Sequence, residues 1–221
     1  MLSGKLQSEC RVGLYRGKVG LDAAEAHHLM EDLDWQGVVK DIAASVKWLK
    51  ENGSPKNISV AITVPGFYLL CVFFVKGGPV TGFCMGGALS LASAVLVPDA
   101  AVAFYGTPNP GLADISTVKV PVQAHFGKKD STKGIFDLEA ANALEKLKAS
   151  GVHSEVFIYI YIYIYIYIYI YIYPGQGHAF VNSSEEAIKR KKAVGFENHD
   201  QGSVDLAWSC FDVWFDKYVK S

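Results

Sequence analysis

The residues most able to do chemistry are Gly82-Phe83-Cys84-Met85-Gly86-Gly87, which have the G-x-nucleophile-x-G pattern with cysteine as the nucleophile. In an elbow of this pattern a strand ends, the chain turns sharply and a helix begins, so the nucleophile is exposed at the turn. The glycines are needed because a Cβ there would collide with the neighbouring strand or helix. The helix N-terminus also favours a thiolate. The pattern predicts Cys84 as a nucleophile; the alternative is a buried cysteine in a glycine-rich turn.

Two later residues could complete a catalytic triad. A thiol needs a base to become a thiolate, and an imidazole needs a carboxylate to fix its tautomer and stabilise its cation. Asp130 follows the apolar run 120–127, which resembles a short buried strand, and His178 lies in the glycine-flanked loop 174–180. Taken singly, each would be read as an ordinary loop residue. Their order along the chain is nucleophile, acid, histidine, which is the order of an α/β-hydrolase, and the three together predict a triad.

Several segments resemble the dienelactone hydrolases (carboxymethylenebutenolidases). They are the elbow G-F-C-M-G-G, the run A-V-A-F-Y-G at 101–106, the acid segment P-V-Q-A-H-F-G-K-K-D, the histidine loop Y-P-G-Q-G-H-A-F-V-N, and A-W-S at 207–209 followed by Phe211. Before the elbow, L-Y-R-G-K at 14–18 and L-D-W at 33–35 also resemble the family. The resemblance covers roughly residues 11–56 and 80–218 of this sequence. The cysteine elbow is its most specific part.

The resemblance implies an enzyme that cleaves a small ester or lactone and needs no cofactor. It implies that Cys84 is the nucleophile, His178 the base and Asp130 the acid that orients the imidazole. The Met85 backbone N–H would form half of an oxyanion hole, and Arg16 resembles an arginine that receives a substrate carboxylate. The fold it implies is α/β: an α/β-hydrolase-like, mostly parallel sheet with helices on both faces, missing the first strands.

Composition is that of one ordinary domain over residues 1–221. The 21 Lys and Arg against 22 Asp and Glu give a net charge of −1, with no basic stripe for nucleic acid. The basic cluster 189–192 is interpreted as a solvated helix face. Four scattered cysteines lack metal-ligand spacing and disulfide patterning, so we expect no metal and a cytoplasmic location.

Residues 158–173 are eight consecutive Ile-Tyr dipeptides. As a strand, this segment would put isoleucine on one face and tyrosine on the other, and it would span roughly 53 Å, about three times a usual strand. An alternating AT tract encodes Ile-Tyr repeats, so we interpret the segment as an expanded insertion. The segment is uncharged and has high β-propensity, so self-association through the repeat is an alternative.

Residues 57–78 form a second probable insertion before the elbow. From Asn57 to Val75 there are 19 uncharged residues, in two apolar runs separated by Pro65-Gly66. A membrane span is the weaker alternative, and no membrane association is expected. Of the two runs, 67–75 is the better candidate for the central strand that leads to Cys84, although Pro79 is a poor occupant of such a strand.

Only about ten residues, Met1 to Cys10, precede the region of resemblance, so the sequence is interpreted as lacking the family's first strands and the loop that supplies the second oxyanion donor. A catalytically impaired or inactive homologue, arising from a degenerate gene copy or a faulty gene model, is therefore the main alternative. Elsewhere the pattern predicts helices over 21–50, 85–95, 135–150 and 202–219, and strands over 102–105 and 120–125. Trp35 and Trp48 are expected to pack in the core, and His125 has no assigned role.

Overall fold

The structure of the protein is a computed structural model that describes residues 8–13, 15, 17–18, 25, 28–29, 31–52, 58–64, 69–75, 79–96, 100–109, 111–130, 154–158, 168–193 and 200–219. The described strands form one sheet in the order β1-β2-β3-β4-β5-β6-β8-β7. They are β1 Ser8–Gly13, β2 Ile58–Val64, β3 Leu69–Val75, β4 Pro79–Phe83, β5 Ala100–Phe104, β6 Val122–Gly127, β7 Ser154–Ile158 and β8 Ile168–Tyr173. The helices are α2 Trp35–Asn52, α3 Met85–Ser93, η1 Ile115–Thr117, α5 Glu185–Ala193 and α6 Gln201–Val219.

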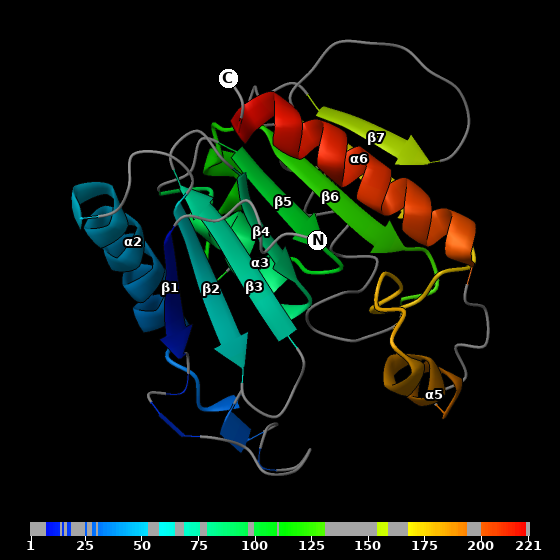
Figure 1. Ribbon diagram of the computed structural model, residues 1–221, viewed down its shortest axis with the longest axis horizontal. Coiled ribbons are helices and arrows are strands. Elements are labelled where there is room, and N and C mark those ends of the chain that lie inside the picture. Colours follow the sequence, from blue (N-terminus) through cyan, green and yellow to red (C-terminus); the bar gives the residue numbers. More distant parts are fainter. Residues whose placement is uncertain are drawn as a thin grey trace.

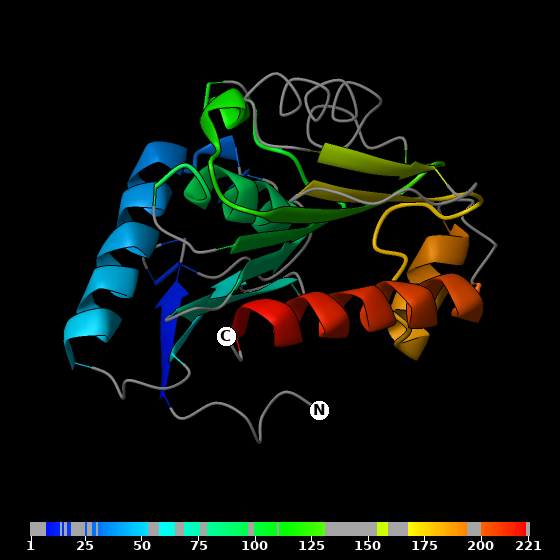
Figure 2. The same ribbon diagram turned by 90° about the horizontal axis from the view of Figure 1, so that it is seen from above.

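The sheet is mostly parallel, as predicted. Neighbours among β4, β5, β6 and β8 pair in parallel, as do β1 with β2 and β7 with β8, whereas β3 is antiparallel to both β2 and β4. Parallel strands are joined by crossovers that place helices on the faces of the sheet. Figure 2 shows this directly, with α6 on one face and α3 on the other.

The strand β5 shows how the sheet is covered on both faces. All five of its residues are buried, and successive side chains point to opposite faces. Val102 and Phe104 pack with Ala207 and Phe211 of α6. Ala101 and Ala103 point to the opposite face and pack in a separate hydrophobic cluster, which includes Leu91 of α3. The small alanines let α3 approach the sheet closely, and α3 carries the elbow.

The helices predicted over 85–95 and 202–219 are confirmed as α3 and α6, whereas the helix predicted over 21–50 is interrupted at 32–34. The helix α2 begins at Trp35 because Asp34 caps it: the Asp34 carboxylate accepts a 2.9 Å hydrogen bond from the Gly37 N–H. Its residues Val38, Val39 and Ile42 are buried at the predicted spacing, but Trp48 is 57% exposed, so its assignment to the core was wrong. The predicted helix over 135–150 lies outside the described residues. In the part of the chain that the structure describes, no helix combines the length and the apolar character needed to cross a membrane.

The two apolar runs of the 57–78 segment are strands β2 and β3, an antiparallel pair between β1 and β4 (Figure 1). The prediction that 67–75 leads into Cys84 was wrong, because the leading strand is β4, which begins at Pro79. A proline can start a strand, since it lacks only the N–H that would otherwise donate to the ladder. A strand of five residues is therefore enough to reach the elbow.

The last three Ile-Tyr dipeptides form β8, which lies between β6 and β7. Its alternation places the two residue types on opposite faces, as predicted. Tyr169, Tyr171 and Tyr173 join the cluster beneath α6, and Ile170 and Ile172 join the cluster on the α3 face. The first residue of the repeat, Ile158, ends β7. The residues between the two strands lie outside the described part of the chain.

Candidate active site

Cys84 occupies the turn between β4 and α3, as the elbow pattern predicts. Its backbone has φ 55° and ψ −122°, a conformation that non-glycine residues rarely adopt and that is held here by the surrounding structure. The Cys84 N–H donates a 2.9 Å hydrogen bond to the carbonyl of Phe104. A Cβ on Gly82 would overlap the carbonyl of Gly86, and one on Gly106 would overlap the carbonyl of Cys84. Glycine at these positions allows the turn to fit tightly against the sheet.

The first turn of α3 follows Cys84 directly. The carbonyl of Cys84 accepts hydrogen bonds from the N–H groups of Gly87 and Ala88, at 2.9 and 3.2 Å. Among the described residues, none accepts a hydrogen bond from the N–H groups of Met85 or Gly86. Such unpaired donors at a helix N-terminus stabilise negative charge. Met85 therefore presents a backbone donor beside Cys84 at the start of α3.

Asp130 and His178 meet across the carboxyl ends of the neighbouring strands β6 and β8. His178 Nδ1 lies 2.9 Å from Asp130 Oδ2. The carboxylate can only accept, so the ring donates from Nδ1 and leaves Nε2 for another partner. The Asp130 side chain is 3% exposed and that of His178 is 20% exposed. The ion pair is thus shielded, with the imidazole on the more open side.

Backbone hydrogen bonds hold the two loops together. The N–H of Lys128 donates to the carbonyl of Tyr173 at 3.0 Å, and the N–H of Lys129 donates to the carbonyl of Gln176 at 2.8 Å. Gly127 allows this contact, because a Cβ there would lie 2.5 Å from the Gln176 carbonyl oxygen. The turn that carries Asp130 is therefore fixed to the loop that carries His178.

Cys84 and Asp130 both affect the protonation of His178. Burial lowers the pKa of His178, but hydrogen bonds with Asp130 and Cys84 and the negative charge of both partners outweigh it and raise that pKa from 6.5 to about 9. The imidazole is therefore held in its protonated form near neutral pH. Cys84 and Asp130 thus both act on the His178 ring, and thiol, imidazole and carboxylate are the groups that nucleophilic catalysis by cysteine uses.

Two residues that the sequence did not indicate help to hold His178. The ring of Tyr105, which has φ 40°, packs edge-on against the His178 ring with centroids 5.1 Å apart. Lys191 of α5 is partly buried, and its ammonium group donates a 2.7 Å hydrogen bond to the carbonyl of Asn182 and longer ones to Ala179 and Phe180. The prediction of a solvated face at 189–192 was therefore wrong for Lys191. Neither contact has a local sequence signal.

His125 lies inside the core. Its Nδ1 is 3.0 Å from the Tyr173 hydroxyl, and its ring stacks between Phe104 and Tyr171 at centroid distances of 4.5 and 4.9 Å. Its Nε2 has no hydrogen-bond partner among the described residues. Burial lowers the pKa of His125 from 6.5 to about 3. His125 is therefore neutral and positions the end of β8, five residues before His178.

The remaining predicted residue, Arg16, lies outside the described residues, so its role stays a prediction. No group of three or more metal-ligating side chains occurs in the described ranges.

Comparisons with known proteins find two similarities. Residues 75–161 match the dienelactone hydrolase family. The matched segment contains Cys84 and Asp130 and ends before His178. The chain is also 27% identical over 213 residues to "Protein usf" from Aquifex pyrophilus, covering 93% of this chain and 72% of that protein. The parallel sheet with its helices and the family match give an α/β-hydrolase-like fold. The similarity is to a family of hydrolases, and it supports hydrolase activity in general.

Proposed function

We propose that the protein hydrolyses a small ester or lactone through Cys84, His178 and Asp130. The observation that carries the proposal is the 2.9 Å contact between Asp130 and His178, together with the raised pKa of His178, to which Cys84 contributes. The strained elbow conformation of Cys84 and the position of the Met85 N–H at the N-terminus of α3 support it. The match to the dienelactone hydrolase family over 75–161 favours the same reaction class.

In the first step the Cys84 thiolate attacks the ester carbonyl, and an Sγ–C bond forms as the C=O electrons move to oxygen. The Met85 N–H stabilises this oxyanion, a contribution worth about 100- to 1000-fold in rate for one donor. The C–O bond then breaks, and the His178 imidazolium gives its proton to the leaving alcohol. In a lactone the alcohol stays attached to the acyl group.

In the second step water attacks the thioester. His178, now neutral, takes a proton from the water, and the tetrahedral intermediate expels the Cys84 thiolate and releases the carboxylic acid. His178 becomes the imidazolium again, and the cycle is complete. Asp130 keeps Nδ1 protonated and stabilises the ring cation in both steps.

Stopped-flow hydrolysis of p-nitrophenyl acetate tests the proposal. We expect a burst of one p-nitrophenolate per chain, acetylation of Cys84 in the intact mass, and loss of both in Cys84→Ala. Cys210→Ala is the matched control, because Cys210 is also a half-buried free cysteine but lies on α6. Turnover that persists in Cys84→Ala would refute the assignment, and a folded chain with no turnover at all would favour the inactive homologue.

A further inference from the structure

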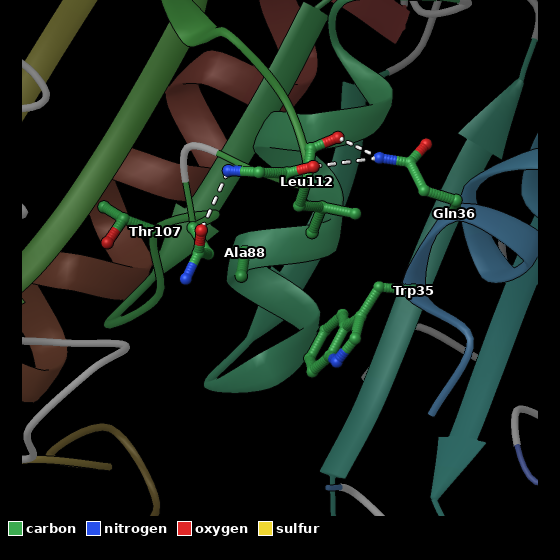
Figure 3. Close-up of a pocket in the computed structure, with 7 residues that line it drawn as sticks. Trp35, Gln36, Ala88, Thr107 and Leu112 are labelled. Carbon is green, nitrogen blue, oxygen red and sulfur yellow. Dashed lines mark hydrogen bonds between the residues drawn. The ribbon is translucent and has the colours of Figure 1, made fainter. Parts of the chain in front are cut away.

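A pocket of about 290 Å³ lies beside the elbow. Its walls come from the start of α2, the first turn of α3 and the loop after β5. The residues that line it include Trp35, Gln36, Ala88, Thr107, Asn109 and Leu112. Figure 3 shows Trp35, Ala88 and Leu112 around one space. These elements are far apart in the sequence, so the pocket is created by the fold.

The pocket begins one helical turn from Cys84. Ala88 donates its N–H to the Cys84 carbonyl at 3.2 Å, and four helical residues rise about 6 Å. The Cα–Cβ bond of a helical residue tilts toward the helix N-terminus, so the Ala88 methyl group points toward the end of α3 where Cys84 lies. Thr107 follows Gly106, which packs directly against Cys84 and Ala88. The pocket therefore begins one helical turn from the backbone of Cys84.

The wall opposite α3 is fixed before any ligand binds. The Gln36 side-chain amide donates hydrogen bonds of 3.1 and 3.0 Å to the carbonyls of Gly111 and Leu112, which tie α2 to the loop after β5 (Figure 3). Asn109 accepts a 2.8 Å hydrogen bond from the Gly111 N–H within the same loop. These contacts hold Leu112 in place and reduce the cost of ordering the pocket upon binding.

The chemistry of the lining selects the ligand. All described residues that line the pocket are uncharged, and Trp35, Ala88 and Leu112 present apolar surface. A carboxylate placed there would lose its hydration without gaining a cation among these residues. An apolar cavity of about 150 Å³ accommodates benzene, so this pocket has room for one aromatic ring and further atoms.

We propose that this pocket binds the acyl group of the substrate and makes the protein selective for esters whose acyl group is uncharged, compact, and aromatic or aliphatic. The proposal rests on the ester hydrolysis proposed above, and it names the substrate class of that same site. Trp35 and Leu112 contact the acyl group, and Ala88 sets the depth of the pocket.

Rates with four p-nitrophenyl esters test the selectivity. We expect kcat/KM for the benzoate and butyrate to exceed that for the hemisuccinate by about tenfold or more, because the hemisuccinate differs from the butyrate in having a terminal carboxylate. The acetate measures turnover without a bulky acyl group. A hemisuccinate that is hydrolysed as fast as the butyrate would overturn the proposal.

Substitutions in the pocket test its location. Ala88→Leu fills the pocket and should lower the ratio of kcat/KM for benzoate to that for acetate by about 10- to 200-fold. Ala44→Leu is the matched control on an exposed face of α2 and should leave this ratio unchanged. Leu112→Ala lies on the loop, is the milder change for folding, and should raise the rate for the 2-naphthoate relative to the benzoate. Ratios that stay unchanged in both pocket variants would overturn the proposal.

Ligand binding separates this proposal from the proposed function. Methyl benzoate added to Cys84→Ala should shift the ¹⁹F resonance of 5-fluorotryptophan at Trp35, assigned with Trp35→Phe, and Ala88→Leu should abolish the shift. Binding without turnover in the parent protein would refute the hydrolase and leave the pocket supported. Turnover that depends on Cys84, with no shift at Trp35, would refute the pocket alone.

Discussion

Replacing Asp130 with asparagine tests the electrostatics of the candidate site. The pKa of His178 is raised from 6.5 to about 9 even though burial opposes the charged ring. At about 1.4 kcal/mol for each pKa unit, the difference corresponds to about 3 kcal/mol in favour of the imidazolium. The hydrogen bond with Asp130 is the largest single favourable contribution to this pKa, followed by the hydrogen bond and charge of Cys84 and then by the charge of Asp130. We therefore expect Asp130→Asn to lower the His178 pKa by about one to two units.

The rate should fall as well. An asparagine can present its N–H₂ group to Nδ1 and favour the wrong tautomer, and the corresponding change in a serine protease triad lowers kcat by about 10,000-fold. We expect a loss of about 100- to 10,000-fold in the hydrolysis of p-nitrophenyl acetate. The high-pH limb of the rate profile, at about pH 9 in the parent protein, should move to lower pH in the variant.

The assay is an NMR titration of the imidazole resonances, with His178 assigned by comparison with His178→Gln. Asp212→Asn is the control, since Asp212 is an exposed aspartate on α6. A His178 pKa that is unchanged in a folded Asp130→Asn protein would show that the ion pair does not form in solution. A pKa that falls while the rate stays the same would show that His178 handles no proton in the rate-limiting step.

The same pair makes stability depend on pH. Because the His178 pKa is raised on folding, its contribution of about 3 kcal/mol is fully present below pH 6.5 and is lost as the pH rises through about 9. Urea unfolding across this range, compared with His178→Gln, should show the loss in the parent protein only.

Three further predictions concern the surroundings of the site. The pKa of His125 is lowered to about 3, so the native state cannot take the proton that the unfolded chain binds below pH 6.5. Between pH 6.5 and 4.5 the parent protein should therefore lose about 2 kcal/mol more stability than His125→Phe, measured by urea unfolding. Lys191→Ala should lower the ester hydrolysis rate about tenfold or more, because the loop after His178 loses its contacts with the ammonium group. Lys192→Ala, on the exposed face of α5, should leave the rate unchanged. Equal rates in the two variants would refute the role of Lys191. Exchanging Ile and Tyr throughout 168–173 would place tyrosines against the small residues on the α3 face of the sheet. This change should abolish cooperative thermal unfolding, monitored by near-UV circular dichroism. A native-like transition would contradict the assigned faces.

The features that the sequence could predict are those with a local cause. The elbow at Cys84 depends on glycines within a few positions, because the strand, the turn and the helix are neighbours along the chain. Asp130 and His178 were recognised from their order and from the strand-like runs before them. The two faces of β8 follow from strict alternation, which a strand converts into opposite sides.

What the sequence could not predict depends on contacts between distant segments. Lys191 belongs to a cluster of cations that resembles a solvated face, and only the position of α5 beside the His178 loop turns it inward. Trp35 and Trp48 are both on α2, yet one lines a pocket and the other is exposed. The start of β4 at Pro79 could not be predicted, because proline is rare in central strands and β4 is shorter than the apolar runs before it.

The uniform composition of β8 leaves its alignment with β6 undetermined by side chains. A shift by two residues would exchange each tyrosine for a tyrosine and each isoleucine for an isoleucine, so packing against α6 would be unchanged. The same shift would displace His178 by about 6.6 Å along the strand direction, which is more than enough to break its 2.9 Å contact with Asp130. The choice among equivalent alignments is therefore made beyond the strand, by the turn after Tyr173 and its hydrogen bonds to Lys128 and Lys129. Misaligned chains would fold to nearly the same sheet and lack the aspartate–histidine pair, so the active fraction of a preparation would report how often this strand is placed correctly.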